Sequence, residues 1–335
     1  MFYFCDINLI EKTTHLLFKL LKLPAKLAIK IYCRNIKIQN KHLLNSDGPL
    51  LIACNHPNSF LDAIILATLF KKPIYSLARG DAFKNKFIAK LLIRLYILPV
   101  YRLSEGNENL NSNYQTFNAC RNIFSKNGIV LIFSEGLCVN EWKLRPLKKG
   151  TARLALSSWE AGINLSVLPI GINYDSFSRF GKNVQINIGN KIEQNEFDFT
   201  SINGQVINDF NLKLFTALKA LVVHVDSTDK KTINSLFYTP ISSIKKTALF
   251  IPSLIGKWLH APIYIPLQRF CWKKFSKIDH YDSALVGLLF FIYPFYISLF
   301  SFAIYILVDS CYWLLPFFIL PISAWSFVQL KKQMD

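Results

Sequence analysis

The sequence predicts an α/β fold in which a mixed β-sheet is flanked by helices, with amphipathic helices before it and a helical membrane hairpin after it. Three features predict this arrangement. Short apolar runs alternate with longer helical patterns between about residues 48 and 222, lysines interrupt a leucine-rich N-terminal segment, and two long uncharged runs lie near the end of the sequence. Alternating strands and helices are typical of α/β layers with a buried sheet.

The first 45 residues are expected to lie at a membrane interface. Residues 16–32 are rich in leucine but are interrupted by four lysines, at positions 19, 22, 26 and 30. A secretory signal needs an uninterrupted apolar run. The segment is therefore interpreted as a pair of interfacial amphipathic helices that breaks near Pro24.

The central domain is expected at residues 46–225 and contains the alternating elements. The predicted strands lie at residues 49–54, 73–78, 97–102, 128–133, 165–170 and 184–188. The predicted helices lie at residues 59–70, 83–96, 114–126 and 151–160. Ser59 is the expected N-cap of the first helix. Residues 226–280 follow as a basic interfacial linker.

Residues 281–335 are expected to form a transmembrane hairpin. Residues 283–308 and 310–330 carry no charge and are separated only by Asp309. Each run exceeds the roughly 20 residues that a spanning helix needs. Lysines flank the pair on both sides, which favours both ends on the cytoplasmic side of the inner membrane, with the central domain facing the cytoplasm. Three prolines inside the runs keep a shallow re-entrant hairpin open as an alternative.

The composition and net charge of the chain indicate which type of partner it binds. The chain has 335 residues, of which 52% are apolar and 18% charged, and its net charge is +18. Such a charge favours an anionic partner. The basic residues are scattered among apolar stretches, and neither zinc-finger spacing nor a glycine–aromatic RNA-binding signature is present, so an anionic membrane surface is favoured over nucleic acid.

The seven cysteines indicate neither a disulfide framework nor a metal site. Their number is odd, they form no CxxC pair, and histidines do not cluster near them. Buried, reduced thiols are therefore expected, and no metal cofactor is expected.

The sharpest motif is the segment 55–62, Asn-His-Pro-Asn-Ser-Phe-Leu-Asp, at a strand–helix junction. Strand ends are where α/β folds expose catalytic groups. Pro57 keeps His56 out of the helix, and Asp62 lies near enough to fix the tautomer of the imidazole. His56 is thus a candidate general base. A histidine with a purely structural, helix-capping role is the alternative.

Two further sets of candidate residues follow predicted strands. Ser134, Glu135 and Gly136 come directly after the strand at 128–133, where Glu135 could bind a polyol hydroxyl; a surface turn is the alternative. The basic candidates for binding a phosphate are Arg79, Arg102, Lys148 and Lys149. Each alone is more typical of a solvated surface charge, and it is their recurrence at successive strand ends that favours a phosphate site.

Together these segments resemble the glycerolipid acyltransferase family, which includes bacterial 1-acylglycerol-3-phosphate and glycerol-3-phosphate acyltransferases. The resemblance covers about residues 45–220. Its four blocks are the segment 55–62, the strand ending at Arg102, the segment 133–136, and the segment 167–170, in the family's order.

The chain departs from the family pattern in two places. Five residues separate His56 from Asp62, where the family usually has four. The third block usually reads Phe-Pro-Glu-Gly-Thr-Arg-Ser, but here Ser134 replaces the proline, and Leu137 and Cys138 replace the Thr-Arg pair. A phosphate-binding arginine is therefore missing from its usual place.

The resemblance implies an enzyme of phospholipid biosynthesis that forms no covalent acyl-enzyme. His56 would deprotonate the hydroxyl of glycerol 3-phosphate or its 1-acyl derivative as it attacks the thioester of acyl-CoA or acyl carrier protein, with no other cofactor. Asp62 would orient His56, and Arg102 with Arg79 would hold the phosphate. Pro169 and Gly171 would shape an acyl channel.

Two other hypotheses stay open. The acceptor could be a lyso-aminolipid, since the third block is irregular, or the chain could be a non-catalytic membrane protein that binds lipid. A serine hydrolase is not favoured, because the sequence has no G-x-S-x-G motif.

Overall fold

The computed structural model describes residues 7–101, 110–199, 203–308 and 311–333. Within these ranges the chain forms a seven-stranded sheet with the order β1-β7-β6-β2-β5-β3-β4. Its strands are β1 (Cys33–Gln39), β2 (Leu50–Cys54), β3 (Ile74–Arg79), β4 (Ile97–Val100), β5 (Ile129–Phe133), β6 (Ser166–Tyr174) and β7 (Lys182–Ile188). The five strands from β6 to β4 are parallel, and β7 runs antiparallel to β6 with β1 parallel to β7. The expected mixed α/β sheet is confirmed.

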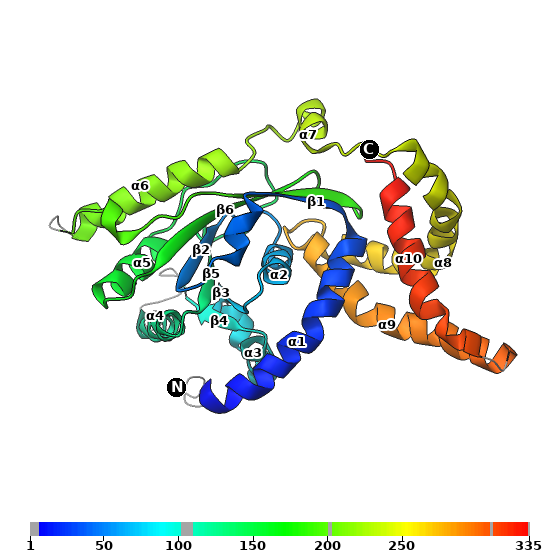
Figure 1. Ribbon diagram of the computed structural model, residues 1–335, viewed down its shortest axis with the longest axis horizontal. Helices are drawn as coiled ribbons and strands as arrows, with labels where there is room; N and C mark the ends of the chain where they lie inside the picture. The colour runs from blue at the N-terminus through cyan, green and yellow to red at the C-terminus, as the bar shows by residue number, and fades with distance from the viewer. Residues whose placement is uncertain (1–6, 102–109, 200–202, 309–310, 334–335) are drawn as a thin grey trace.

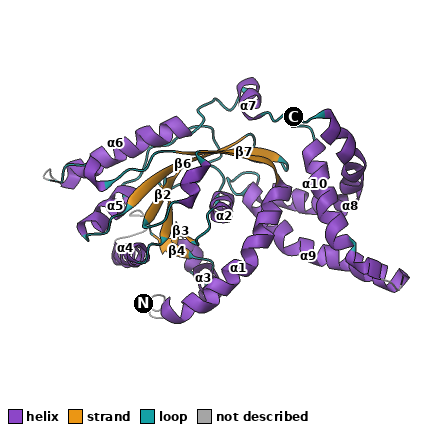
Figure 2. Cartoon of the chain, viewed as in Figure 1, coloured by secondary structure: helices purple, strands orange, loops and turns teal. Residues whose placement is uncertain are grey.

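Helices cover both faces of this sheet (Figures 1 and 2). They are α1 (Ile7–Tyr32), α2 (Phe60–Leu69), α3 (Lys86–Arg94), α4 (Leu110–Ser125), α5 (Gly150–Glu160), α6 (Asn203–Leu221), α7 (Lys230–Phe237), α8 (Ser243–Phe275), α9 (Tyr281–Val308) and α10 (Pro316–Leu330). Alternate side chains of β2 enter two separate cores. Leu50 and Ile52 pack with α1 and α2, whereas Leu51 and Ala53 pack with α4, α5 and α6. Burial on both faces explains why β2 is a continuous apolar run.

The N-terminal segment differs from the expected pair of helices ending near residue 45. Helix α1 continues through Pro24 to Tyr32, and β1 begins at the next residue. A proline removes one backbone hydrogen bond from a helix, but packing of the following turns can maintain the helix. Here Ile29 and Tyr32 are buried in the core after Pro24. The sheet therefore starts at Cys33, inside the region we assigned to interfacial helices.

The C-terminal region contains a third apolar helix. In the described part of the chain, α8, α9 and the segment Cys311–Leu330 are each long and apolar enough to cross a membrane. We expected a basic linker at residues 226–280, but α8 occupies most of it and packs against α10 at Gly256, where a Cβ would lie 2.1 Å from the carbonyl oxygen of Ser323. Such close approach at small residues is typical of helix pairs in membranes. The three helices indicate association with a membrane.

Helices α9 and α10 form a hairpin whose two ends lie against the sheet (Figure 1). At the start of α9, the Ser283 hydroxyl donates to the carbonyl of Asn58 over 3.0 Å. At the end of α10, the Arg34 guanidinium of β1 donates from Nε to the carbonyl of Val328 over 3.1 Å. The apolar hairpin is thus joined to the sheet at both ends.

Candidate active site

The register of the parallel strands brings the predicted motifs to one edge of the sheet. Cys54, the last residue of β2, pairs with Phe133 of β5 on one side and with Ile170 of β6 on the other. The Asn55 side chain then bonds to the backbone of Ile172 in both directions, accepting from its N–H over 2.8 Å and donating to its carbonyl over 3.0 Å. His56 therefore lies directly after the last residue of this segment that is hydrogen-bonded to a neighbouring strand.

His56 and Asp62 form a hydrogen-bonded pair. The distance from His56 Nδ1 to Asp62 Oδ2 is 2.9 Å; the imidazole is 18% exposed and the carboxylate is fully buried. The Asn58 N–H donates to Asp62 Oδ2 over 2.9 Å, and the Tyr174 hydroxyl donates to Oδ1 over 2.7 Å. With Nδ1–H directed at the carboxylate, the lone pair of the imidazole is on Nε2, which has no hydrogen-bond partner among the described residues.

The extra residue between His56 and Asp62 is accommodated in the loop. Ser59 adopts φ 53° and ψ −142°, an unusual conformation for a residue other than glycine, immediately before α2 begins at Phe60. This turn lets Asp62, in the first turn of α2, face back toward the imidazole. The five-residue spacing is therefore compatible with the His–Asp pair.

Two aromatic groups hold the pair in place. The Phe133 ring stacks on the His56 imidazole with centroids 3.8 Å apart and planes 12° apart. Burial, and next the charge of Asp62, raise the pKa of Tyr174 well above its usual value, so its hydroxyl stays protonated and donates to the carboxylate. The imidazole thus has one defined orientation.

Glu135 supports the loop rather than presenting a free carboxylate. It is 6% exposed, and its two oxygens accept the backbone N–H groups of His56 and Arg145, each over 2.8 Å. Burial raises the pKa of this carboxyl, while the two backbone hydrogen bonds oppose that rise. We expected Glu135 to bind glycerol hydroxyls. The structure instead shows it fixing the backbone at His56 to the loop that leads into α5.

Of the other candidate residues near Glu135, Ser134 is buried and the two lysines are exposed. Ser134 is buried and its hydroxyl accepts a hydrogen bond from Thr151 over 3.0 Å, so the expected substrate contact is replaced by an internal one. Gly136 has φ 64°, and a Cβ there would lie 3.0 Å from Cγ of Lys148. Lys148 and Lys149 are exposed at the N-terminal end of α5. One exposed cation, Lys148, therefore lies beside the glycine of the third block, and a second, Lys149, follows it in the sequence.

The structure does not bring the arginines predicted to bind phosphate to His56 within its described residues. Arg79 ends β3, its side chain is 53% exposed, and it forms an ion pair with Asp81 of the following turn. Arg102 lies outside the described residues. A role for either in holding a phosphate stays a prediction.

The expected acyl channel at Pro169 and Gly171 is not found there. Both residues are buried within β6, and a Cβ on Gly171 would lie 2.5 Å from the carbonyl oxygen of Leu221, at the end of α6. The carbonyl of Pro169 accepts from Gly189 over 2.9 Å. Close packing of β6 against α6, rather than a channel, accounts for the small residue.

Cys138, at the position where the family usually has arginine, connects two loops. Its sulfur accepts the N–H of Ser59 over 3.0 Å and lies 3.7 Å from the carbonyl of Asp279, which precedes α9. Burial, followed by the charge of Asp62, raises the pKa of this thiol to about 12. Cys138 is therefore a neutral thiol in the loop and not a nucleophile at neutral pH.

The start of α9 contacts the His56 loop directly, which the sequence did not predict. The Asn58 side chain donates to Asp282 Oδ2 over 2.8 Å, and the N–H of Leu61 donates to the Ser283 hydroxyl over 3.1 Å. His280 Nδ1 lies 2.8 Å from the Ser59 hydroxyl. An apolar helix of the C-terminal region is thus packed against the backbone that carries the His–Asp pair.

Asp282 is itself part of a buried network. Its carboxylate forms an ion pair with Lys182 of β7 and accepts a hydrogen bond from the Tyr32 hydroxyl of α1, and both charged side chains are fully buried. The Lys182 ammonium lies 5.4 Å from the Tyr32 ring centroid and 5.7 Å from that of Tyr174. A carboxylate at the head of an apolar run was visible in the sequence, but only the fold shows its partners.

Comparison with known proteins agrees with the resemblance that the sequence motifs suggested. A family model described as Acyltransferase matches residues 35–173, which run from β1 into the end of β6 and include His56, Asp62 and Glu135. The 1-acyl-sn-glycerol-3-phosphate acyltransferase of Bacillus subtilis is 28% identical over 121 residues, covering 36% of this chain and 56% of the relative. The match thus spans little more than half the length of that relative.

A solved structure, that of the 1-acyl-sn-glycerophosphate (LPA) acyltransferase PlsC from Thermotoga maritima, aligns with 63% of this chain and 83% of its own, at 14% identity and a TM-score of 0.43. The family-model match ends before Tyr174, Lys182 and Asp282. The family model and the curated relative agree with the resemblance that the motifs suggested, and residues 35–173 of this chain are similar to the Acyltransferase family.

Proposed function

We propose that the protein is a membrane-bound O-acyltransferase that moves a fatty acyl group from acyl-CoA or acyl carrier protein to a hydroxyl of glycerol 3-phosphate or 1-acylglycerol 3-phosphate. One observation carries the proposal: within the region that matches the acyltransferase family model, His56 is oriented by buried Asp62, and its Nε2, at the edge of the sheet, has no hydrogen-bond partner in the described part of the chain. The location of this domain on the cytoplasmic side of the inner membrane belongs to the same proposal.

The geometry supports direct attack by the acceptor. As the acceptor oxygen bonds to the thioester carbonyl carbon, its proton passes to His56 Nε2. The tetrahedral intermediate then collapses, the carbon–sulfur bond breaks, and the departing thiolate takes the proton from His56. Asp62 stabilises the imidazolium that exists between these two transfers, and Tyr174 and Asn58 hold the carboxylate in place.

The polar groups near His56 support a reaction without an acyl-enzyme. Burial raises the pKa of both Cys54 and Cys138, so neither is a thiolate at neutral pH. The Ser134 hydroxyl is buried and bonded to Thr151. The substrate hydroxyl is then the nucleophile, and the proposed steps require no cofactor other than the acyl donor.

An acceptor with a phosphate is favoured by Lys148, which lies beside Gly136, and by Lys149, which follows it. Lys148 and Lys149 are exposed and follow the loop that begins at Glu135 and Gly136. Glu135 is in turn hydrogen-bonded to the backbone N–H of His56. The Bacillus subtilis relative is named as an acyltransferase of a phosphate-bearing acceptor, 1-acyl-sn-glycerol 3-phosphate. A lyso-aminolipid acceptor is the second candidate, because Cys138 stands where the family usually has arginine.

The test is an acceptor panel with labelled acyl-CoA and labelled acyl carrier protein. We expect transfer to 1-acylglycerol 3-phosphate or glycerol 3-phosphate, with kcat/KM roughly 10- to 100-fold above that of a matched acceptor without phosphate, the range of a charge-assisted contact. Replacing both Lys148 and Lys149 with methionine should remove this preference. Lys219→Met, on the exposed side of α6, is the matched control and should not.

Three results separate the candidates. Equal or better use of a phosphate-free lyso-aminolipid would favour the second acceptor class. If the preference for phosphate acceptors persists after Lys148 and Lys149 are replaced, other residues bind the phosphate. Absence of transfer to every acceptor, from folded protein in lipid, would indicate a non-catalytic lipid-binding role and refute the proposal.

A further inference from the structure

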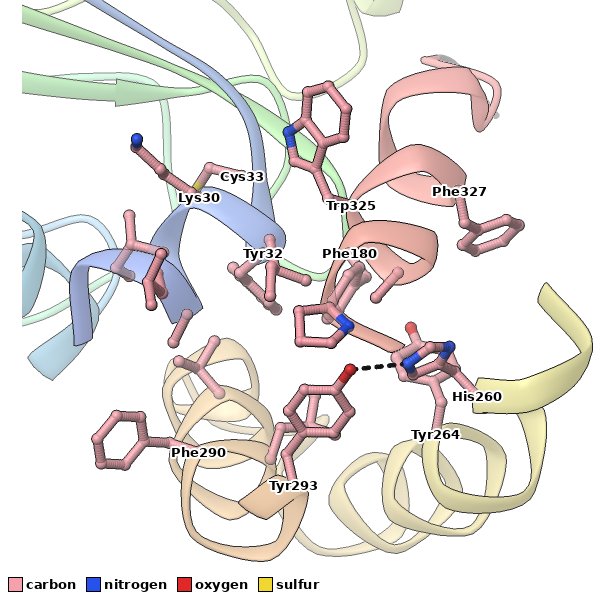
Figure 3. A pocket seen from close by; sticks show the side chains of 18 of the residues that line it. Lys30, Tyr32, Cys33, Phe180, His260, Tyr264, Phe290, Tyr293, Trp325 and Phe327 are labelled. Carbon is pink, nitrogen blue, oxygen red and sulfur yellow. Dashed lines mark hydrogen bonds between the residues drawn. The ribbon is translucent and has the colours of Figure 1, made fainter. Parts of the chain in front are cut away.

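A large cavity lies among the helices outside the sheet. It has a volume of about 1140 Å³, opens to the surface, and is lined mainly by residues of α1, β1, α8, α9 and α10 (Figure 3). Small-molecule sites are typically about 300–1,000 Å³. The lining includes none of His56, Asp62 or Glu135. The cavity is therefore separate from the candidate active site and is large enough for a guest of lipid size.

The walls of the cavity suit a hydrocarbon chain. Aromatic and aliphatic side chains from the three apolar helices dominate, among them Phe290, Trp325 and Phe327. The polar pair drawn in Figure 3 is internally satisfied, since His260 lies 2.9 Å from the Tyr293 hydroxyl through Nε2 and 2.8 Å from the Gly256 carbonyl through Nδ1. A guest placed beside this pair does not need to supply hydrogen bonds.

The charges that line the cavity have one sign. Among the residues that the structure describes, five lysine and arginine side chains and no carboxylate line it. Two of these cations bond to backbone carbonyls, Arg34 to Val328 and Lys331 to Phe180. Lys26 and Lys30 are exposed and stand one turn apart on α1, so their side chains lie on the same face of that helix. An anionic group at this rim would meet two neighbouring ammonium groups.

We propose that the cavity binds an acyl chain of an anionic glycerophospholipid, with the lipid phosphate held by Lys26 and Lys30. Three of the helices that line the cavity, α8, α9 and α10, belong to segments that are long and apolar enough to cross a bilayer, where such lipids are present at high concentration. The proposal does not depend on acyl transfer at His56. A lipid there would fill the space between α1 and the C-terminal helices.

The experiment uses the full chain with the background substitution His56→Ala, so that added lipid is not consumed. Binding of phosphatidic acid and of phosphatidylcholine with the same chains is measured by native mass spectrometry in mild detergent. We expect phosphatidic acid to bind roughly 10-fold or more tightly, as two lysines near a phosphate imply. Replacing Lys26 and Lys30 with glutamate should abolish this preference.

Two further variants locate the lipid. Lys86→Glu with Lys90→Glu reverses another exposed pair one turn apart, on α3 away from the cavity, and should leave the preference intact. Ala261→Trp fills the cavity and should reduce the amount of bound lipid. Equal binding of the two lipids, an equal effect of both lysine pairs, or full lipid occupancy in a folded Ala261→Trp protein would each overturn the proposal. Failure of the protein with His56 intact to transfer acyl groups would instead count against the proposed function, and it would not affect the lipid-binding proposal.

Discussion

Replacing His56 with alanine is expected to lower kcat for acyl transfer by about 10²- to 10⁴-fold, the usual contribution of a general base. The side chain is partly exposed, and without it the buried Asp62 carboxylate still accepts hydrogen bonds from the Asn58 N–H and the Tyr174 hydroxyl, so the substitution removes the proton acceptor without leaving that carboxylate unpaired. The assay is release of free thiol from the acyl donor in the presence of acceptor, at saturating concentrations of both.

His42→Ala is the matched control for this prediction. His42 lies in an exposed turn before β2 and should be dispensable. Asp62→Asn should also lower kcat, since an amide cannot stabilise the imidazolium as a carboxylate does. If the His56 variant retained kcat within a few-fold of the wild type, His56 would not be the base.

Breaking the ion pair between Lys182 and Asp282 is expected to cost about 3–5 kcal/mol of folding stability, the usual cost of leaving one partner of a buried pair uncompensated. Asp282→Asn leaves a buried ammonium, and Lys182→Met leaves a buried carboxylate. The double variant removes both charges while the new amide oxygen can still accept from Tyr32 or Asn58. It should therefore be more stable than either single variant.

Thermal unfolding of the four proteins in one detergent measures this non-additivity as a double-mutant cycle. Activity of the double variant adds information, because Asn58 joins Asp282 to the loop that carries His56 and Asp62. We expect reduced kcat even where stability is restored. Additive losses in the single and double variants would show that the two charges are not coupled, contrary to the structure.

Much of the sheet could be predicted because its strands are buried on both faces. The runs at β2 and β5 are continuously apolar, the run at residues 167–172 of β6 is likewise without a polar side chain, and the structure places strands there. Strand β1 was not predicted, because residues 33–39 mix cations and amides with isoleucine and lie at the edge of the sheet. Helix α8 was not predicted because lysines and three internal prolines lower the apparent continuity of its apolar sequence.

The part of the candidate active site that lies within one short segment could be predicted from the sequence. The segment 55–62 contains both His56 and Asp62, so the pair follows from local sequence and the strand–helix junction. Glu135 was found, but its partners are backbone N–H groups of distant loops, which no sequence pattern reveals. Asp282 lies more than 200 positions from Asn58, and only the packing of α9 against the loop makes the two neighbours.

The most direct test of the account is a structure with 1-acylglycerol 3-phosphate bound. The account predicts the acceptor hydroxyl oxygen within hydrogen-bond distance of His56 Nε2, roughly 2.6–3.2 Å, while Nδ1 keeps its bond to Asp62. An acceptor bound with its hydroxyl remote from His56, or a protein group occupying Nε2 in that complex, would contradict it.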